Sequence, residues 1–144
     1  MKFAINFLSV TLIAVSLGGC ATPLNSAQKR EYQSYQARGI TVEEKSPGTG
    51  AALGLLPGGG SFYNREYGFG VINLLFWPLS ILWDPISGYD GSLSINYFAT
   101  KADLNAKMGK EIRDLDDQLV LSTVTKEDYI RRKRDIETRY GAGN

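Results

Sequence analysis

The chain of 144 residues contains no histidine and only one cysteine, Cys20. Histidine is the side chain that titrates nearest neutral pH and the commonest metal ligand, so its absence removes the usual general base and the usual ligand of zinc. The best candidate catalytic set pairs a serine with an aspartate, but the sequence supplies no histidine and no suitably placed lysine to activate the serine. We therefore expect neither catalysis nor a metal site. The residues considered for catalysis are Ser61, Ser87, Asp84 and Asp90.

Net charge is also nearly lacking, because 16 Lys and Arg residues stand against 15 Asp and Glu residues. Without a basic excess there is no electrostatic drive toward phosphates, so nucleic acid is not an expected partner. The charges are distributed unevenly: residues 21–47 carry 7, residues 48–91 carry 4 together with 10 glycines, and residues 92–144 carry 19. No one of these segments is long enough for a large globular core, since ordinary domains have about 100–150 residues.

Long uncharged runs are scarce, and the first one lies near the N-terminus. Lys2 precedes the 15 uncharged residues from Phe3 to Leu17, and two small residues then lead to Cys20. This run is shorter than the roughly 20 apolar residues that span a bilayer, and small residues after it are typical of a cleaved signal peptide. The alternative is that Cys20 is a buried free thiol in a core helix.

Leu17-Gly18-Gly19-Cys20 resembles the lipobox of bacterial lipoproteins, in which a branched aliphatic residue and two small residues precede a modified cysteine. The resemblance implies cleavage between Gly19 and Cys20, which makes residues 1–19 a signal peptide. It also implies a diacylglycerol and an amide-linked acyl chain on Cys20, which suffice for stable anchoring; no other cofactor is expected. Inner-membrane lipoproteins of enteric-type bacteria commonly carry Asp where Ala21-Thr22 stand here, which favours the periplasmic face of the outer membrane over the inner membrane.

Residues 20–47 follow as the lipidated N-terminus and a tether. The segment is rich in Ser, Gln, Lys, Arg and Glu, and its few apolar residues hold no period of two or 3.6, which favours a mobile or partly helical linker. The stretch from Ser26 to Arg38 is the part that can form a short helix, with Ser26 as its N-cap. As an alternative, Tyr32 and Tyr35 would contact peptidoglycan or a protein partner.

Residues 48–91 form a Gly-rich, apolar centre in which two apolar pieces flank a polar turn. The second piece, Phe69 to Trp83, has 15 residues without a charge. A helix of that length is about 22 Å long, short of the roughly 30 Å of hydrocarbon in a bilayer, and Pro78 would kink it. These lengths favour a re-entrant or shallow membrane hairpin over two spans. A hairpin buried in a small soluble core is the alternative, and it would need another hydrophobic layer.

The turn of this centre resembles that of the two-transmembrane-helix (TM-two) family, over about residues 51–85. The features that carry the resemblance are Gly58-Gly59-Gly60, the aromatic pair and the arginine after them, the later Gly68 and Gly70, and the Trp83-Asp84 pair. The same glycines invite a phosphate-loop interpretation, but the Gly-Lys-Ser/Thr ending of that motif is absent. The resemblance implies a membrane hairpin and no chemistry. Its turn residues would be Gly58, Gly59, Gly60, Phe62, Tyr63 and Arg65.

Residues 92–144 carry a helical pattern. Apolar residues recur from Leu93 to Leu119 at spacings of three, four and seven, which predicts one long amphipathic helix. The stretch from Ser87 to Gly91 before it is rich in turn-forming residues and predicts a turn, and alternation from Leu93 to Tyr97 leaves a short strand as an alternative. Thr125 then begins a second helix as its N-cap, with Asp128 at N3.

The two helices resemble SHOCT, a short C-terminal domain of two small helices, over about residues 111–140. Ser122 stands where that family prefers Gly, and the basic run from Arg131 to Arg134 would be either a solvated face or a contact with anionic headgroups. The resemblance implies a role in protein association or as the end piece of a membrane protein. The matching positions are Leu115, Leu119, Val124, Thr125, Glu127, Asp128, Tyr129 and Lys133. Pairing of the helices would form an interaction seam from Leu115, Leu119, Tyr129 and Ile136.

These segments predict a mainly α protein with a signal helix, a flexible tether, a Gly-rich membrane-associated hairpin, a C-terminal amphipathic αα-hairpin and no large globular core. The expected function is that of a membrane-anchored envelope lipoprotein with a structural or protein-interaction role. Its expected partners are membrane lipids and either another protein or further copies of the chain. Membrane remodelling or oligomeric pore formation by the hairpin is the alternative function.

Overall fold

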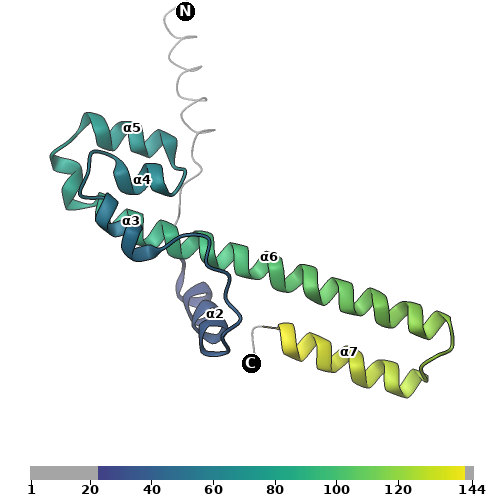
Figure 1. Ribbon diagram of the computed structural model, residues 1–144. Helices are drawn as coiled ribbons and strands as arrows, with labels where there is room; N and C mark the ends of the chain where they lie inside the picture. The colour runs from purple at the N-terminus through teal and green to yellow at the C-terminus, as the bar shows by residue number, and fades with distance from the viewer. Residues whose placement is uncertain (1–22, 142–144) are drawn as a thin grey trace, which may run out of the picture. The chain divides into compact units, whose positions relative to one another are not determined.

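The computed structural model describes residues 23–141, so the predicted signal peptide, Gly19 and Cys20 lie outside the described residues. Within residues 23–141 the protein is mainly helical, it contains no strand, and it has no large globular core, which confirms the predicted class at this level. The elements in chain order are α2 (Ser26–Ala37), α3 (Pro47–Leu53), α4 (Gly59–Tyr63), α5 (Tyr67–Leu75), the 3-10 helix η1 (Leu79–Leu82), α6 (Asp84–Val120) and α7 (Lys126–Tyr140) (Figure 1).

The chain divides into two compact units. Of the described residues, unit 1 contains Pro23 and Lys45–Ile95, with α3, α4, α5, η1 and the first part of α6. Unit 2 contains Leu24–Glu44 and residues 96–141, with α2, the rest of α6 and α7. The single helix α6 therefore contributes to both units.

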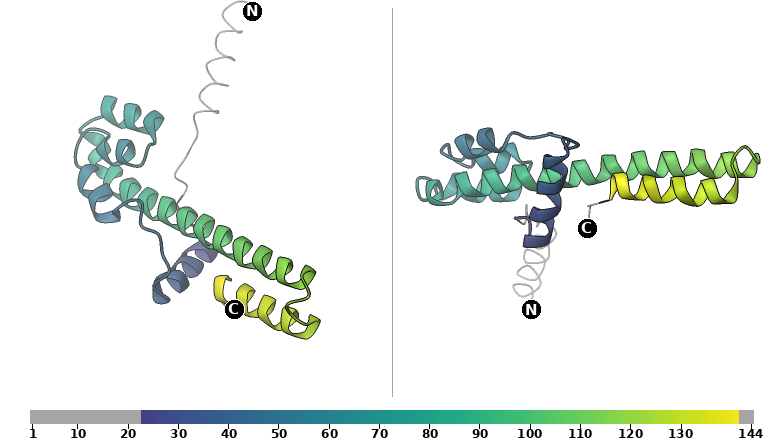
Figure 2. Two further views of the ribbon diagram at one scale, coloured as in Figure 1. Left: turned by 45° about the vertical axis from the view of Figure 1, so that its right-hand side comes forward. Right: turned by 90° about the horizontal axis from the view of Figure 1, so that it is seen from below.

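Short helices that contact one another in chain order form unit 1. Both figures show α3, α4 and α5 near the first turns of α6 (Figures 1 and 2). Ser46 caps α3, and Pro47 occupies the first turn, where its missing N–H costs nothing. The turn predicted here is instead a short helix: Gly58, with φ of 69°, is the N-cap of α4. Of the other predicted turn residues, Gly59, Gly60, Phe62 and Tyr63 lie in α4, and Arg65 follows it with φ of 67°.

The second apolar run does not form the single kinked helix that the sequence predicts. α5 ends at Leu75. Between it and the start of α6 at Asp84, the only helical element is the four-residue η1. Pro78 lies between α5 and η1 and has no N–H with which to continue the α-helical hydrogen bonds. Within residues 23–141, every helix is too short or too polar to cross a membrane.

α6 begins at Asp84, well before the predicted start. Ser87 to Gly91, predicted as a turn, are helical, and the residues from Leu93 to Tyr97 continue the helix rather than form a strand. Close packing accounts for the wrong prediction, because a Cβ on Gly88 would lie 2.2 Å from the carbonyl oxygen of Gly50. A residue of low helix propensity is thus held in a helix by tertiary contact.

For the first part of unit 2 the sequence predicts a mobile or partly helical tether, with Ser26 to Arg38 as the part that can form a helix, and α2 (Ser26–Ala37) forms over that stretch. Asn25, not Ser26, is the N-cap of α2: its Oδ1 accepts from Gln28 N at 2.9 Å, and Gln28 Oε1 accepts from Asn25 N at 3.0 Å. This reciprocal pair is a capping box. Tyr32 and Tyr35 are buried on the inner face of α2.

α7 begins as the sequence predicts. Thr125 Oγ1 accepts a hydrogen bond from Asp128 N at 3.2 Å, which confirms Thr125 as the N-cap and Asp128 as N3. Before it, Ser122 adopts φ of 56°, the left-handed conformation in which a helix commonly ends at glycine. Both figures show α7 returning beside the C-terminal half of α6 (Figures 1 and 2).

Candidate functional site

Large hydrophobic side chains lie on the outside of unit 1. They come from the α3–α4 link, α5, η1 with the residues beside it, and the start of α6. Leu75 and Leu82 are each 74% exposed. Exposed apolar patches on folded proteins mark a contact with another molecule or with a membrane. This apolar exterior consists of Leu55, Leu56, Tyr67, Phe69, Val71, Ile72, Leu74, Leu75, Phe76, Trp77, Leu79, Leu82, Trp83, Ile86 and Tyr89.

The inside of unit 1 is polar. In the described part of the chain, the fully buried hydrophobic side chains all belong to unit 2, and none belongs to unit 1. A polar interior beneath an apolar exterior reverses the arrangement of a water-soluble domain. It is the arrangement that lipid demands, because polar groups there must find their partners within the protein. The buried polar residues of unit 1 are Ser61, Asn64, Glu66, Asn73, Ser80, Asp84, Ser92 and Ser94.

A fully buried carboxylate, that of Asp84, organises this interior. Its Oδ1 accepts hydrogen bonds from Ser61 Oγ and Asn73 Nδ2, both at 2.7 Å, and its Oδ2 accepts from Gly60 N at 3.2 Å. Trp83 Nε1 donates to Asn73 Oδ1 at 2.9 Å, which fixes the orientation of that amide. Three donors therefore stabilise the carboxylate. We call Ser61, Asn73, Trp83 and Asp84 the Asp84 cluster; two of the residues considered for catalysis, Ser61 and Asp84, meet here.

The backbones of α3 and α6 touch where two glycines face each other. A Cβ on Gly50 would lie 2.3 Å from Gly88 O, so only glycine fits at this crossing. Beside it, Asn64 Nδ2 donates to Gly88 O at 2.8 Å, and Ser92 Oγ lies 2.8 Å from Asn64 Oδ1. Small residues at a helix contact, with polar side chains bonded across it, are typical of helices that associate in membranes.

Unit 2 has a conventional apolar core and one polar cluster that joins α2 to α6. The carboxylate of Glu31 accepts hydrogen bonds from Tyr35 Oη at 2.6 Å and Tyr97 Oη at 2.7 Å, and Lys101 Nζ lies 3.3 Å from its Oε1. We call these four residues the Glu31 cluster. The buried hydrophobic residues of unit 2 are Leu24, Tyr32, Tyr35, Tyr97, Leu104, Leu115 and Ile136.

Protonation in the Glu31 cluster follows from these contacts. Burial alone would raise the pKa of Glu31, but the hydrogen bonds from Tyr35, Tyr97 and Lys101 outweigh it and hold this pKa below its ordinary value. Burial, together with the hydrogen bond to the Glu31 carboxylate, raises the pKa of Tyr35 to about 12. The cluster is therefore a carboxylate with two neutral phenols at neutral pH.

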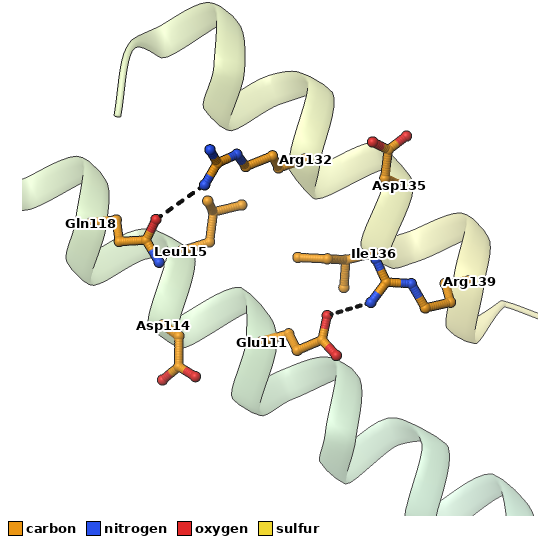
Figure 3. A pocket seen from close by; sticks show the side chains of 8 residues that line it. All are labelled: Glu111, Asp114, Leu115, Gln118, Arg132, Asp135, Ile136 and Arg139. Atoms are coloured by element: carbon orange, nitrogen blue, oxygen red, sulfur yellow. Dashed lines mark hydrogen bonds and ion pairs between the residues drawn. The ribbon is translucent and has the colours of Figure 1, made fainter. Parts of the chain in front are cut away.

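A groove of about 290 Å³ lies between α6 and α7 of unit 2 (Figure 3). Leu115 from α6 and Ile136 from α7 point into the space between the two helices and form its apolar floor. Charged and polar side chains surround this floor. The groove is lined by Glu111, Asp114, Leu115, Gln118, Arg132, Asp135, Ile136 and Arg139.

Two pairs of side chains link the helices along this α6–α7 groove. Arg139 Nη1 lies 3.0 Å from Glu111 Oε2, and Arg132 Nη1 donates to Gln118 Oε1 at 3.3 Å (Figure 3). In both pairs the arginine comes from α7 and its acceptor from α6. The α6 wall also carries Asp114, and the α7 wall also carries Asp135, so charges of both signs line the groove.

The residues of the predicted interaction seam fall in two places. Leu115 and Ile136 line the groove, whereas Leu119 and Tyr129 are half-buried and do not line it. Tyr129 nevertheless joins the two helices, because its Oη donates to Asp116 Oδ1 at 2.8 Å.

The sequence analysis missed both polar clusters. For the Asp84 cluster a signal was present: small or polar residues recur every fourth position along α6, which places them on one face of the helix. For the Glu31 cluster there was none, because Glu31 and Tyr97 are 66 positions apart. The residues at every fourth position, all buried, are Asp84, Gly88, Ser92, Asn96 and Thr100.

Comparisons of the chain with protein-family models, with curated proteins and with solved structures gave no match. The resemblances to a lipobox, to the TM-two turn and to SHOCT therefore stay predictions from the sequence. Among residues 23–141, no group of three or more His, Cys, Asp or Glu side chains is placed to hold a metal ion.

Proposed function

We propose that this protein is a membrane-anchored envelope lipoprotein with a structural or protein-interaction role. The observation that carries the proposal is the polarity of unit 1, with fifteen large hydrophobic side chains outside and eight polar side chains inside. Transfer of such an exterior from water to an apolar environment is favourable. Lipid is therefore the expected surrounding of unit 1, and a membrane is the expected location of the protein.

The predicted acylation of Cys20 supplies the second membrane attachment. Cys20 stands four positions before Leu24, where unit 2 begins, so an acyl anchor would hold unit 2 close to the membrane surface. Acyl chains with a second hydrophobic contact give stable rather than reversible attachment. The envelope, with the periplasmic face of the outer membrane favoured, is the location that this anchor implies.

The α6–α7 groove is the proposed association surface. Leu115 and Ile136 are buried beneath it, with 3% and 7% of their surfaces exposed, so the groove offers a partner mainly its charged and polar walls. Asp114 on the α6 wall and Arg132 on the α7 wall would pair with opposite charges on a helix from a partner or from another copy of the chain. These charged walls contribute mainly specificity.

Mass spectrometry of the protein from membranes tests the anchor. We expect a mature chain that begins at Cys20 with acyl chains attached. An unmodified precursor, or a Cys20→Ser variant with unchanged maturation and membrane attachment, would contradict the proposal.

Photo-crosslinking tests the association surface. A photoreactive residue at Asp114, which lines the groove, should give adducts of defined mass in native membranes. The matched control is Lys110, which is exposed on the same helix and does not line the groove. Monomer alone from both positions, or equal adducts from both, would argue against the groove as the binding surface.

A further inference from the structure

The two ends of unit 1 lie close together. Glu44, the residue before unit 1, donates from its N to Asn96 Oδ1, on the residue after unit 1, at 2.9 Å. Val42 N donates to Thr100 Oγ1, also at 2.9 Å, and strengthens the same junction. Because both segments belong to unit 2, the chain must leave unit 2 for unit 1 and return to it at one place. If unit 1 is embedded in a membrane, the chain enters and leaves on the same side.

The elements of unit 1 are too short to reach across a bilayer. α5 has 9 residues, or about 14 Å, and the part of α6 that belongs to unit 1, residues 84–95, is about 18 Å long, against a hydrocarbon core of roughly 30 Å. The length of α5 therefore matches one leaflet, which is about half of that core. Residues 67–83, from α5 through η1, carry no charge, so nothing in them must be kept at the depth of the headgroups.

Lipid fits the apolar exterior better than a second copy does. The exposed hydrophobic side chains come from four different parts of unit 1, including Leu56, Leu75, Leu82 and Ile86. Fluid acyl chains conform to side chains from several elements at once. Eight polar side chains of unit 1 are buried, and the glycines of α3 and α6 leave no space between these two helices.

We propose that unit 1 is inserted into the acyl chains of a single leaflet, as a re-entrant body that enters and leaves the membrane on the side of unit 2. This inference rests on the proposed membrane function and adds depth and topology to it. The apolar exterior would then contact the acyl chains of one leaflet.

The two tryptophans of the chain provide the test. Trp77 and Trp83 are the only ones in the sequence, and both belong to the apolar exterior, with 50% and 44% of their surfaces exposed. The mature, acylated protein is reconstituted into phospholipid vesicles that carry bromine, which quenches tryptophan, either near the glycerol end or near the methyl end of the acyl chains. The variants Trp77→Phe and Trp83→Phe report on each ring separately.

Insertion in one leaflet predicts a loss of fluorescence with at least one of the two lipids, and the lipid that gives the larger loss reports how deep each ring lies in that leaflet. Quenching of either ring by iodide confined to the side of the membrane away from unit 2 would show that unit 1 reaches across the bilayer, and would overturn the one-leaflet topology. No loss with either lipid would overturn insertion itself. Fluorescence shielded from both lipids and from aqueous iodide would show that protein covers the exterior, and would equally overturn it.

The outcomes distinguish this inference from the proposed function. If Cys20 is acylated and the tryptophans are not quenched, the proposal of an anchored lipoprotein is supported and the proposal that unit 1 is inserted is refuted. Quenched tryptophans on a chain whose Cys20 is unmodified give the reverse result. Circular dichroism of each variant, with unchanged helix content, shows that a change in quenching does not come from unfolding.

Discussion

Unit 1 and unit 2 differ in the kind of side chain that each one buries. All 7 of the buried hydrophobic side chains described belong to unit 2, whereas 8 of the 10 buried polar or charged residues belong to unit 1. Unit 2 gains stability from removing apolar surface from water. Unit 1 has no such core and is held by hydrogen bonds and by close contact of glycine backbones, which are the interactions that remain useful in lipid.

α6 carries this difference within one helix. Along one face, spaced by four, small and polar residues run from Asp84 to Thr100, and the next position on that face is the buried Leu104. The change from polar to apolar burial along this face comes between Thr100 and Leu104, within unit 2. The contact face of a single helix thus changes composition along its length.

The largest expected effect separates a buried leucine from an exposed one. Leu115→Ala should destabilise unit 2 by about 3 kcal/mol, because it leaves a cavity where the side chain is only 3% exposed. Leu75→Ala in unit 1 should change the free energy of unfolding by less than about 0.5 kcal/mol, since Leu75 is 74% exposed. Denaturant unfolding followed by circular dichroism in one detergent measures both, and equal losses would erase the distinction between the units.

Two glycines of α6 give the next largest contrast. Gly88→Ala should destabilise unit 1 by about 2 to 3 kcal/mol, because the new Cβ would meet the backbone of Gly50 at 2.2 Å. Gly109→Ala in unit 2 should stabilise the helix by up to about 1 kcal/mol, because a Cβ there meets only the end of the Arg113 side chain, at 3.4 Å. Thermal unfolding of the pair should show opposite shifts; shifts of the same sign would refute the backbone contact.

A smaller effect, dependent on pH, is expected from the Glu31 cluster. Since the folded state lowers the pKa of Glu31, its contribution is present above the unfolded value of 4.5 and is lost as pH falls through the lower folded value. Glu31→Gln should cost about 1 to 2 kcal/mol at neutral pH and should flatten the loss of stability below pH 4.5. A variant that keeps the wild-type acid profile would show that Glu31 does not set it.

The helix caps give the smallest contrast. Thr125→Ala should cost unit 2 about 1 kcal/mol through the loss of the α7 cap. Ser46→Ala in unit 1 should cost less, because Ser46 Oγ accepts from Thr49 N at 3.4 Å, a longer contact than the 3.2 Å at Thr125. Urea unfolding of both variants measures the order, and a larger loss at Ser46 would reverse it.

The features that could be predicted from the sequence are those set by residues close to one another in the chain. The N-cap at Thr125, the helical pattern of α6 and the shortness of the apolar run depend on residues that are near one another in the chain. The sequence also allows a helix over the stretch of α2, but it does not predict how that helix packs, because the ring partner of Tyr32 is Tyr97, far along the chain, at 6.3 Å between centroids. The early start of α6 was not predictable for the same reason, since the contact that favours glycine at position 88 comes from Gly50 in α3, far from it in the sequence.

The candidate site was predictable in composition and not in geometry. Gly-rich and uncharged sequence indicated a membrane contact at residues 48–91, but hydrogen bonds decide which side chains face inward. Asp84 is the clearest example, because a charged residue beside Trp83 predicts the end of an apolar run. In the structure it is instead the fully buried acceptor for donors from α4 and α5.

The central claim, that the apolar exterior of unit 1 faces lipid, is tested most directly by placing one lysine on each unit. Leu75→Lys in unit 1 and Leu121→Lys in unit 2 change residues of nearly equal exposure, 74% and 72%. A lysine in the acyl layer costs about 2.5 to 3.5 kcal/mol. Quenching of Trp77 by brominated lipid should therefore fall in the Leu75→Lys protein and stay unchanged in the Leu121→Lys protein. Equal quenching in the two variants would contradict the claim.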